Sequence, residues 1–205
     1  MKTKFPILSD TAKVIADPLV RSQATVCGNL AHGDPANDHP ATMLALGASV
    51  VETGPNGQRE IPVADFFPGL FTTALEPEEI LTEIKIPVPP PRSGGAYLKL
   101  ERKVGDYATA GVAAQITLDD AGTCKKAGIG LTNVGMTPIK AKQTEAFLTG
   151  KQLDDATIQQ AAELAASESE PIDDIRGSAE YKRDLVRVLT ARALTAALSR
   201  AKGGA

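Results

Sequence analysis

The sequence has 205 residues, of which 42% are hydrophobic and 23% charged, with a formal net charge of −3 at pH 7. This composition is typical of a soluble globular protein with one large domain or two small ones, and it excludes the clustered basic surface of a nucleic-acid-binding protein. No apolar run approaches the roughly 18 residues of a transmembrane helix, and the N-terminus lacks the apolar segment of a signal peptide. We therefore expect a cytoplasmic protein whose two cysteines, Cys27 and Cys124, stay reduced.

Two short helices are predicted near the N-terminus. The first runs from Ser9, where Ser9 or the next residue is the N-cap, and ends before Pro18. The second covers residues 40–48, with proline in its first turn and Asp38 or His39 as its cap.

A hairpin and a strand follow. The β-rich runs 49–53 and 59–66 flank the turn sequence GPNGQ, in which Gly57 can supply a positive φ. The alternation of apolar and polar residues over 76–88 then predicts a half-buried strand.

Residues 87–95 (PVPPPRSGG) indicate a domain boundary, because consecutive prolines are incompatible with a central strand. We place one domain over 1–92 and a second over 93–205. The second domain begins with an expected antiparallel meander of three strands, over residues 96–103, 111–119 and 124–135.

Three helices are expected to complete the chain, so the predicted fold class is α+β. They cover 139–148 after a Thr-Pro pair, then 154–166, then 178–202. The apolar face of the last helix is predicted from its spacing to comprise Tyr181, Leu185, Val188, Leu189, Ala193 and Ala196.

Residues 24–40 (ATVCGNLAHGDPANDHP) contain few side chains large enough for a core, and a metal site is one possible role. Four potential ligands lie close in sequence: His32, Asp34, Asp38 and His39. Their spacing matches no helical His pair, and two prolines interrupt the segment. We therefore favour loop or capping roles for the two histidines, with metal-free ligand contact as an alternative.

Anion binding is the other chemistry that this segment offers. The backbone N–H groups of Thr25, Val26, Cys27, Gly28 and Asn29 could converge as a nest on a phosphate, although a plain turn remains open. Asp38 could accept hydrogen bonds from sugar or ribityl hydroxyls, or could instead cap the following helix.

Four runs together carry a family resemblance: residues 17–41, DFFPG (65–69), EPEEIL (76–81) and AYLKLERKVGDYATAGVA (96–113). Over nearly its entire length the chain resembles the FAD-binding medium subunit of the molybdenum hydroxylases, of the aerobic carbon monoxide dehydrogenase type and related to the flavin domain of xanthine dehydrogenase. The resemblance implies the second subdomain of a PCMH-type FAD-binding domain, followed by a C-terminal three-stranded antiparallel sheet with a helical bundle.

The resemblance also implies cofactor-binding residues for FAD and no catalytic residue. Thr25, Val26, Cys27, Gly28 and Asn29 would hold the phosphates, and Asp38 would bind hydroxyl groups of FAD. Leu81 would make an apolar contact with the flavin and Lys99 a polar contact near its ring. Tyr107 would lie beside the isoalloxazine, its alternative role being that of a buried strand tyrosine.

Two departures from the family pattern lead to further expectations. Cys27 stands where the family commonly has glycine, so its Cβ is expected to hinder close backbone approach to the phosphates. The usual N-terminal subdomain with its A-G-G-x-S phosphate loop is missing from this sequence. We therefore expect the chain alone to bind FAD weakly.

The function implied by the resemblance is electron transfer within a larger enzyme. An iron-sulfur small subunit and a molybdenum-cofactor large subunit would complete a heterotrimer, and two heterotrimers would pair. FAD would pass electrons to a quinone or another acceptor. The alternative is a truncated or structural subunit that docks its partners without flavin. A nicotinamide enzyme is disfavoured because no G-x-G-x-x-G motif links a strand to a helix.

Overall fold

The computed structural model describes residues 4–203, which form seven α-helices and seven strands. In chain order the elements are α1 (Pro6–Val14), α2 (Pro18–Arg21), α3 (Val26–Ala31), α4 (Asp38–Leu46), β1 (Ser49–Gly54), β2 (Gly57–Pro62), the 3-10 turn η1 (Val63–Asp65), β3 (Ile80–Lys85), β4 (Ser93–Glu101), β5 (Ala108–Leu118), β6 (Cys124–Thr132), β7 (Ile139–Lys140), α5 (Lys142–Leu148), α6 (Asp155–Glu168) and α7 (Ala179–Ala201). The predicted α+β class is confirmed.

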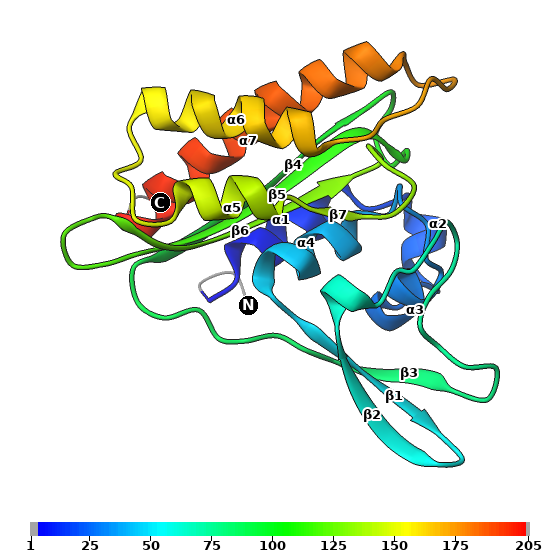
Figure 1. Cartoon of the computed structure of the whole chain (residues 1–205). Coiled ribbons are helices and arrows are strands. Elements are labelled where there is room, and N and C mark those ends of the chain that lie inside the picture. The colour runs from blue at the N-terminus through cyan, green and yellow to red at the C-terminus, as the bar shows by residue number, and fades with distance from the viewer. Residues whose placement is uncertain (1–3, 204–205) are drawn as a thin grey trace.

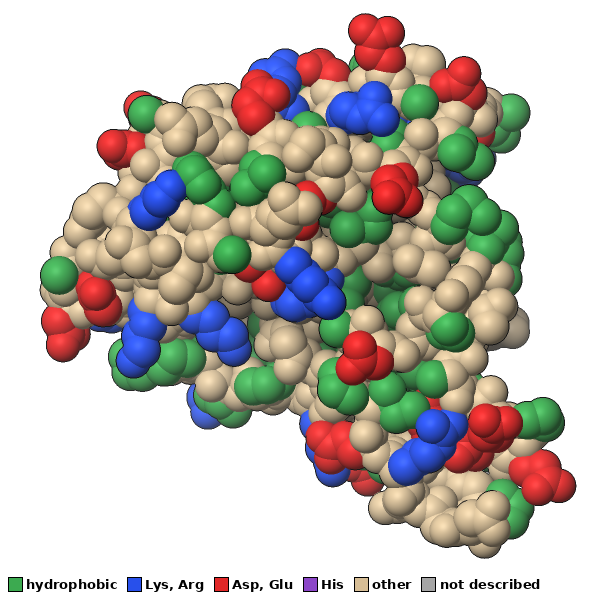
Figure 2. Space-filling view, viewed as in Figure 1, with side chains coloured by type: hydrophobic (Ala, Val, Ile, Leu, Met, Phe, Trp, Pro, Cys, Tyr) green, Lys and Arg blue, Asp and Glu red, His purple; other side chains and the backbone are tan. Residues whose placement is uncertain are grey.

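The strands form two antiparallel sheets. The smaller has the order β2-β1-β3 and extends from one corner of the molecule, and the larger has the order β4-β5-β6-β7 (Figure 1). Helices α5, α6 and α7 lie on one face of the larger sheet, and α1 and α4 lie on the other (Figure 1). Acidic and basic side chains are interspersed over the face shown in Figure 2.

Strand β5 is buried on both faces because helices cover both sides of its sheet. Val112, Ala114 and Ile116 belong to the core shared with α6 and α7. Ala113 points the opposite way, into the core shared with α1 and α4. This double burial explains why β5 is rich in small apolar residues instead of alternating apolar and polar ones.

Two glycines of β6 allow α4 to lie directly against the strand. A Cβ at Gly128 would collide with the carbonyl oxygen of Ala45, and a Cβ at Gly130 with that of Ala41. Glycine is required here for close approach and not for a special φ, because neither residue has a positive φ. The contact fixes the direction of α4, and so the place of its N-terminus at Asp38.

Several predicted elements are confirmed. The hairpin of β1 and β2 turns through Gly57 at a φ of 106°, and the expected strand over 76–88 contains β3. The meander of β4, β5 and β6 and the last two helices are also present.

Other predictions were wrong at the ends of elements. Helix α1 begins at Pro6, three residues before Ser9, because proline is compatible with a first helical turn. Asn37 is the N-cap residue of α4 and makes no side-chain capping hydrogen bond, so neither Asp38 nor His39 caps that helix.

The C-terminal part also differs from expectation. Ile139 and Lys140 pair with β6 as β7, so the sheet has four strands instead of three, and α5 begins only at Lys142. The predicted face of α7 is partly wrong, because Tyr181 is 46% exposed whereas the neighbouring Lys182 is 2% exposed. The burial of Lys182 could not be predicted from the spacing of apolar residues along α7.

The domain boundary at residue 92 stays a prediction. Strand β4 begins at Ser93, directly after it. However, α1 and α4 precede the boundary and share a core with Tyr97 and Ala113, which follow it. Among residues 4–203, no helix is long and apolar enough to cross a membrane.

Candidate functional site

A cavity of about 650 Å³ lies where the first helices meet the loop before β5. This volume is within the range typical of small-molecule and cofactor sites. The cavity is lined by Ala12, Ile15, Ala16, Asp17, Val20, Arg21, Gln23, Ala24, Thr25, Val26, Gly28, Asn29, His32, Ala36, Asn37, Asp38, His39, Gly105, Asp106 and Tyr107. Six of the nine predicted site residues are therefore on its wall, and Cys27, Leu81 and Lys99 are not.

The predicted phosphate nest is the first turn of α3. Thr25 is the N-cap, and its Oγ1 accepts a hydrogen bond of 2.9 Å from the N–H of Gly28. The N–H of Asn29 donates to the Thr25 carbonyl oxygen at 3.0 Å. Of the groups expected to converge, the N–H groups of Thr25, Val26 and Cys27 are the ones for which residues 4–203 provide no acceptor.

Two buried polar atoms on residues of the cavity wall also lack a partner among the described residues. They are Oδ1 of Asn29 and Nδ1 of His39. Burial, with a smaller effect of the Arg21 guanidinium, lowers the pKa of His39 to about 4, so its imidazole is neutral near pH 7. A buried polar atom without a partner is costly, and these two atoms therefore fit a ligand with hydrogen-bonding groups, such as FAD.

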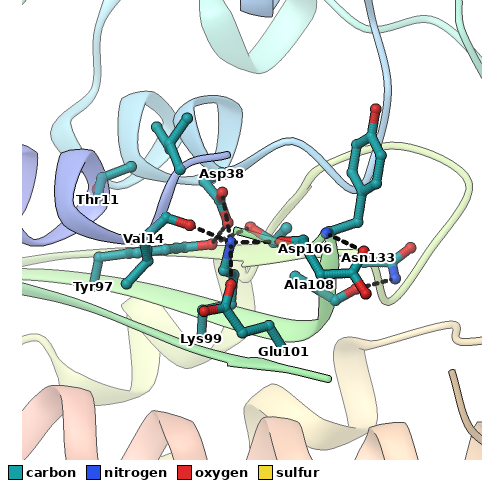
Figure 3. A network of polar contacts seen from close by, with 12 residues as sticks. Thr11, Val14, Asp38, Tyr97, Lys99, Glu101, Asp106, Ala108 and Asn133 are labelled. Atoms are coloured by element: carbon teal, nitrogen blue, oxygen red, sulfur yellow. Dashed lines mark hydrogen bonds and ion pairs between the residues drawn. The ribbon is translucent and has the colours of Figure 1, made fainter. Parts of the chain in front are cut away.

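Asp38 is held from below by β4 (Figure 3). The Tyr97 hydroxyl donates to its Oδ1 at 2.5 Å, and Lys99 Nζ donates to its Oδ2 at 3.0 Å. Burial raises the pKa of Asp38, and the contacts with Lys99 and Tyr97 oppose that effect. The carboxylate is thus oriented at the edge of the cavity before any ligand binds.

Lys99 connects three segments of the cavity wall, although its own side chain has no exposed surface. Its ammonium donates to the carbonyl oxygens of Val14 at 2.6 Å and of Asp106 at 3.0 Å, besides Asp38 (Figure 3). It also forms an ion pair of 3.1 Å with Glu101. Lys99 therefore joins the end of α1, the start of α4 and the loop before β5.

Tyr107 lies in that loop, one residue before β5 begins. Its side chain is 45% exposed, so the alternative of a buried strand tyrosine is wrong. The N–H of Tyr107 donates to Asp106 Oδ1 at 2.8 Å, and this bond orders the backbone that carries the ring.

Cys27 and Leu81 face a core instead of the cavity. Both pack in the apolar cluster that includes Leu30, Met43 and Phe66. Cys27 has no positive φ and occupies an ordinary helical position in α3. The expectation that its Cβ hinders backbone approach to the phosphates stays a prediction, and the packing of the side chain against this core weighs against it.

The candidate metal ligands do not form a cluster. Asp34 Oδ1 accepts from the N–H of Ala36 at 2.8 Å, and Asp38 is paired with Lys99. The ring of His32 packs against Phe71 with centroids 5.6 Å apart. Among residues 4–203, no three His, Cys, Asp or Glu side chains are grouped to hold a metal ion.

Two arginines at this site were missed by the sequence analysis. Arg21 carries the only permanent positive charge among the described lining residues, and it donates to the carbonyl oxygens of Ala12 and Ile15. Arg176 lies behind Tyr107, with its Cζ 5.5 Å from the ring centroid. Arg21 is close in sequence to the 24–40 segment, whereas Arg176 is 69 positions from Tyr107 and no local signal connects the two.

Comparison with known families gives two matches that follow each other along the chain. Residues 1–89 match the FAD binding domain in molybdopterin dehydrogenase. Residues 95–197 match the CO dehydrogenase flavoprotein C-terminal domain.

Individual relatives agree with these matches. The carbon monoxide dehydrogenase medium chain of Afipia carboxidovorans is 46% identical over 202 residues, covering 98% of this chain and 70% of that protein. The alpha subunit of the 6-hydroxypseudooxynicotine dehydrogenase complex of Paenarthrobacter nicotinovorans is 36% identical over 198 residues, covering 97% of this chain and 67% of that protein.

A solved structure of carbon monoxide dehydrogenase from Hydrogenophaga pseudoflava superimposes with a TM-score of 0.93 and 44% identity, covering 97% of this chain and 69% of the other. The family matches, the identities and the superposition agree over almost the whole chain. The chain therefore belongs to the FAD-binding medium-subunit family of the molybdenum hydroxylases, a family of oxidoreductase flavoproteins.

Proposed function

We propose that FAD binds in the cavity between α3, α4 and the loop that carries Tyr107. The observation that carries this proposal is the pair of partnerless buried atoms, Asn29 Oδ1 and His39 Nδ1, on a cavity wall that also contains a half-exposed tyrosine. A dinucleotide has hydroxyl and phosphate oxygens for such atoms and a flat ring for an aromatic side chain. Family membership supports the same ligand.

The predicted residues on the cavity wall bind different parts of FAD in this proposal. The start of α3 presents to the phosphates the N–H groups of Thr25, Val26 and Cys27, which have no acceptor among residues 4–203, and the Thr25 cap orders this turn. Asp38 accepts hydrogen bonds from hydroxyl groups of FAD with the lone pairs that Tyr97 and Lys99 leave free. Tyr107 packs beside the isoalloxazine.

The two remaining predicted residues act differently in this proposal. Lys99 orients Asp38 and fixes the loop before β5 through its bond to Asp106, and it does not touch the flavin ring itself. Leu81 supports α3 from the core. A direct apolar contact between Leu81 and the flavin stays a prediction.

We infer that the chain serves electron transfer in a complex with an iron-sulfur small subunit and a molybdenum-cofactor large subunit, paired as two heterotrimers. Bound FAD supplies the redox chemistry, and the chain supplies binding, orientation and electrostatics. The electrons pass from the iron-sulfur subunit to a quinone or another acceptor. Relatives are named for substrates as different as carbon monoxide and 6-hydroxypseudooxynicotine, and the substrate would react on another subunit.

The test is a FAD titration of the chain, alone and assembled with its partner subunits, with two matched variants. Tyr107→Leu should weaken FAD binding about tenfold through loss of ring contact. Tyr181→Leu is the control, because that side chain is exposed to the same extent, 46% against 45%, and lies outside the cavity. An assembled complex that takes up no FAD on this chain would reject the proposal in favour of a structural subunit without flavin.

A further inference from the structure

Arg176 reaches from the C-terminal half of the chain to the loop that carries Tyr107. It belongs to the connection between α6 and α7. Its Nη2 donates to Asp106 Oδ1 at 3.2 Å, and its Cζ lies 5.5 Å from the centroid of the Tyr107 ring. The arginine side chain is 18% exposed. Both an ion pair and a cation–π contact therefore connect it to the edge of the cavity.

The backbone that carries Arg176 is itself fixed to α7. Lys182, which is 2% exposed, binds Asp174 Oδ2 at 2.7 Å and donates to the carbonyl oxygen of Ile172 at 3.2 Å. The N–H of Arg176 donates to Asp174 Oδ1 at 2.8 Å. The buried Lys182 thus orders the connection between α6 and α7, and the guanidinium of Arg176 extends from a backbone that is fixed by hydrogen bonds.

Asp106 is the point where these contacts meet. Its Oδ1 accepts from the Tyr107 N–H at 2.8 Å and from Arg176 at 3.2 Å. Arg102 also lies 3.4 Å from Oδ2, but its side chain is 51% exposed and is therefore screened by water. These hydrogen bonds lower the pKa of Asp106 although desolvation raises it.

We propose that Arg176 is a positioning residue for the flavin site: it holds the Tyr107 ring at the cavity wall and places a permanent positive charge against that ring. Through Lys182 and Arg176, the C-terminal helices then set the geometry of a cavity built mainly from the first 40 residues. The consequence for FAD rests on the proposed function, whereas the position of the ring does not depend on it.

The experiment uses the full chain with ¹³C-labelled tyrosine rings, followed by NMR without FAD and during a FAD titration. The chain has three tyrosines, so the signals of Tyr107 can be assigned by Tyr107→Leu. In Arg176→Gln we expect the Tyr107 signals to move before any FAD is added and the dissociation constant for FAD to rise about 3- to 10-fold. Arg176→Lys keeps the charge without the planar guanidinium. Its Tyr107 signals and its dissociation constant for FAD should lie between those of the unaltered chain and those of Arg176→Gln.

Arg187→Gln is the matched control. It removes the same charge from an ion pair with Asp184 on the exposed side of α7, and it should change neither the Tyr107 signals nor FAD binding. A double-mutant cycle gives the sharpest readout, because Arg176→Gln should have no further effect on FAD binding in the Tyr107→Leu background.

Unchanged Tyr107 signals in Arg176→Gln would overturn the inference, as would an equal loss of FAD affinity with and without Tyr107. Absence of FAD binding by the unaltered chain, both alone and assembled, would instead reject the proposed function. In that case the Tyr107 signals recorded without FAD still decide whether Arg176 positions the ring. Thermal unfolding of each variant identifies any loss that is due to misfolding.

Discussion

The sheet core and the cavity wall of this protein are stabilised in different ways. In the core, β6 and α4 touch through glycine and alanine backbones with no room for a further atom. In the wall, short segments are joined to one another by the hydrogen bonds of long charged side chains, above all Lys99 and Arg176. The core is therefore expected to be sensitive to added volume, and the wall to the loss of a charge partner.

The largest expected effect is the loss of Lys99. Lys99→Met leaves the carboxylates of Asp38 and Glu101 without their shared cation, and removal of one partner of a buried ion pair costs about 3–5 kcal/mol of folding stability. Urea unfolding measures this loss. Lys85→Met is the control, because the Lys85–Glu60 pair is exposed and its loss should change stability little. Equal losses in both variants would contradict the role of Lys99 in the wall.

An added methyl group tests the core. In Gly130→Ala the new Cβ collides with the carbonyl oxygen of Ala41 in α4, so we expect a loss of about 3 kcal/mol in the free energy of unfolding. Gly69→Ala is the control, because a Cβ there meets only ordinary contacts and the residue has no positive φ. A Gly130→Ala variant as stable as the control would show that α4 is free to move away from β6.

The pH dependence of stability tests the partly buried imidazole of His39. The pKa of His39 is lowered from 6.5 to about 4 in the folded state, so from pH 6.5 downward the unfolded chain takes up a proton that the folded protein does not. The contribution of neutral His39 to the free energy of unfolding is therefore fully present above pH 6.5. It is lost as the pH falls from 6.5 towards 4, and the loss amounts to about 2–3 kcal/mol.

Unfolding curves at pH 7 and at pH 4.5 measure this effect as the difference between the unaltered chain and His39→Gln. The variant should lose less stability on acidification. His32→Gln is the matched control, because that histidine is exposed, and it should keep the pH dependence of the unaltered chain. A His39→Gln variant with the same dependence would mean that His39 titrates normally.

The smallest expected effect concerns Cys27. Cys27→Gly should destabilise the protein by about 1 kcal/mol, since glycine weakens a helix and the side chain leaves a core contact. It should not tighten FAD binding. Cys27→Ala separates the loss of the side chain from the flexibility of glycine. Tighter FAD binding in Cys27→Gly alone would mean that the Cβ does hinder the phosphates.

Much of the site could be inferred from sequence because its chemistry is local. Thr25, Gly28 and Asn29 lie within one helical turn, and a Thr cap beside a glycine is a short-range pattern. The position of Tyr107 at the cavity could be proposed through the family resemblance. What each side chain touches depends on partners distant in sequence, such as Lys99 for Asp38, 61 positions away.

Local patterns alone determined the α+β class, the hairpin through Gly57, the meander of β4 to β6 and the two long C-terminal helices, because turns and periodic burial are properties of neighbouring residues. Tertiary structure decided that Cys27 and Leu81 pack in a core and that Ile139 starts a fourth strand instead of a helix. It also decided that Lys99 and Arg176 hold segments of the cavity wall in place, and that Lys182 orders the connection that carries Arg176. A charged residue becomes buried only where a fold brings oxygen atoms to it, and no local pattern records where those atoms will be.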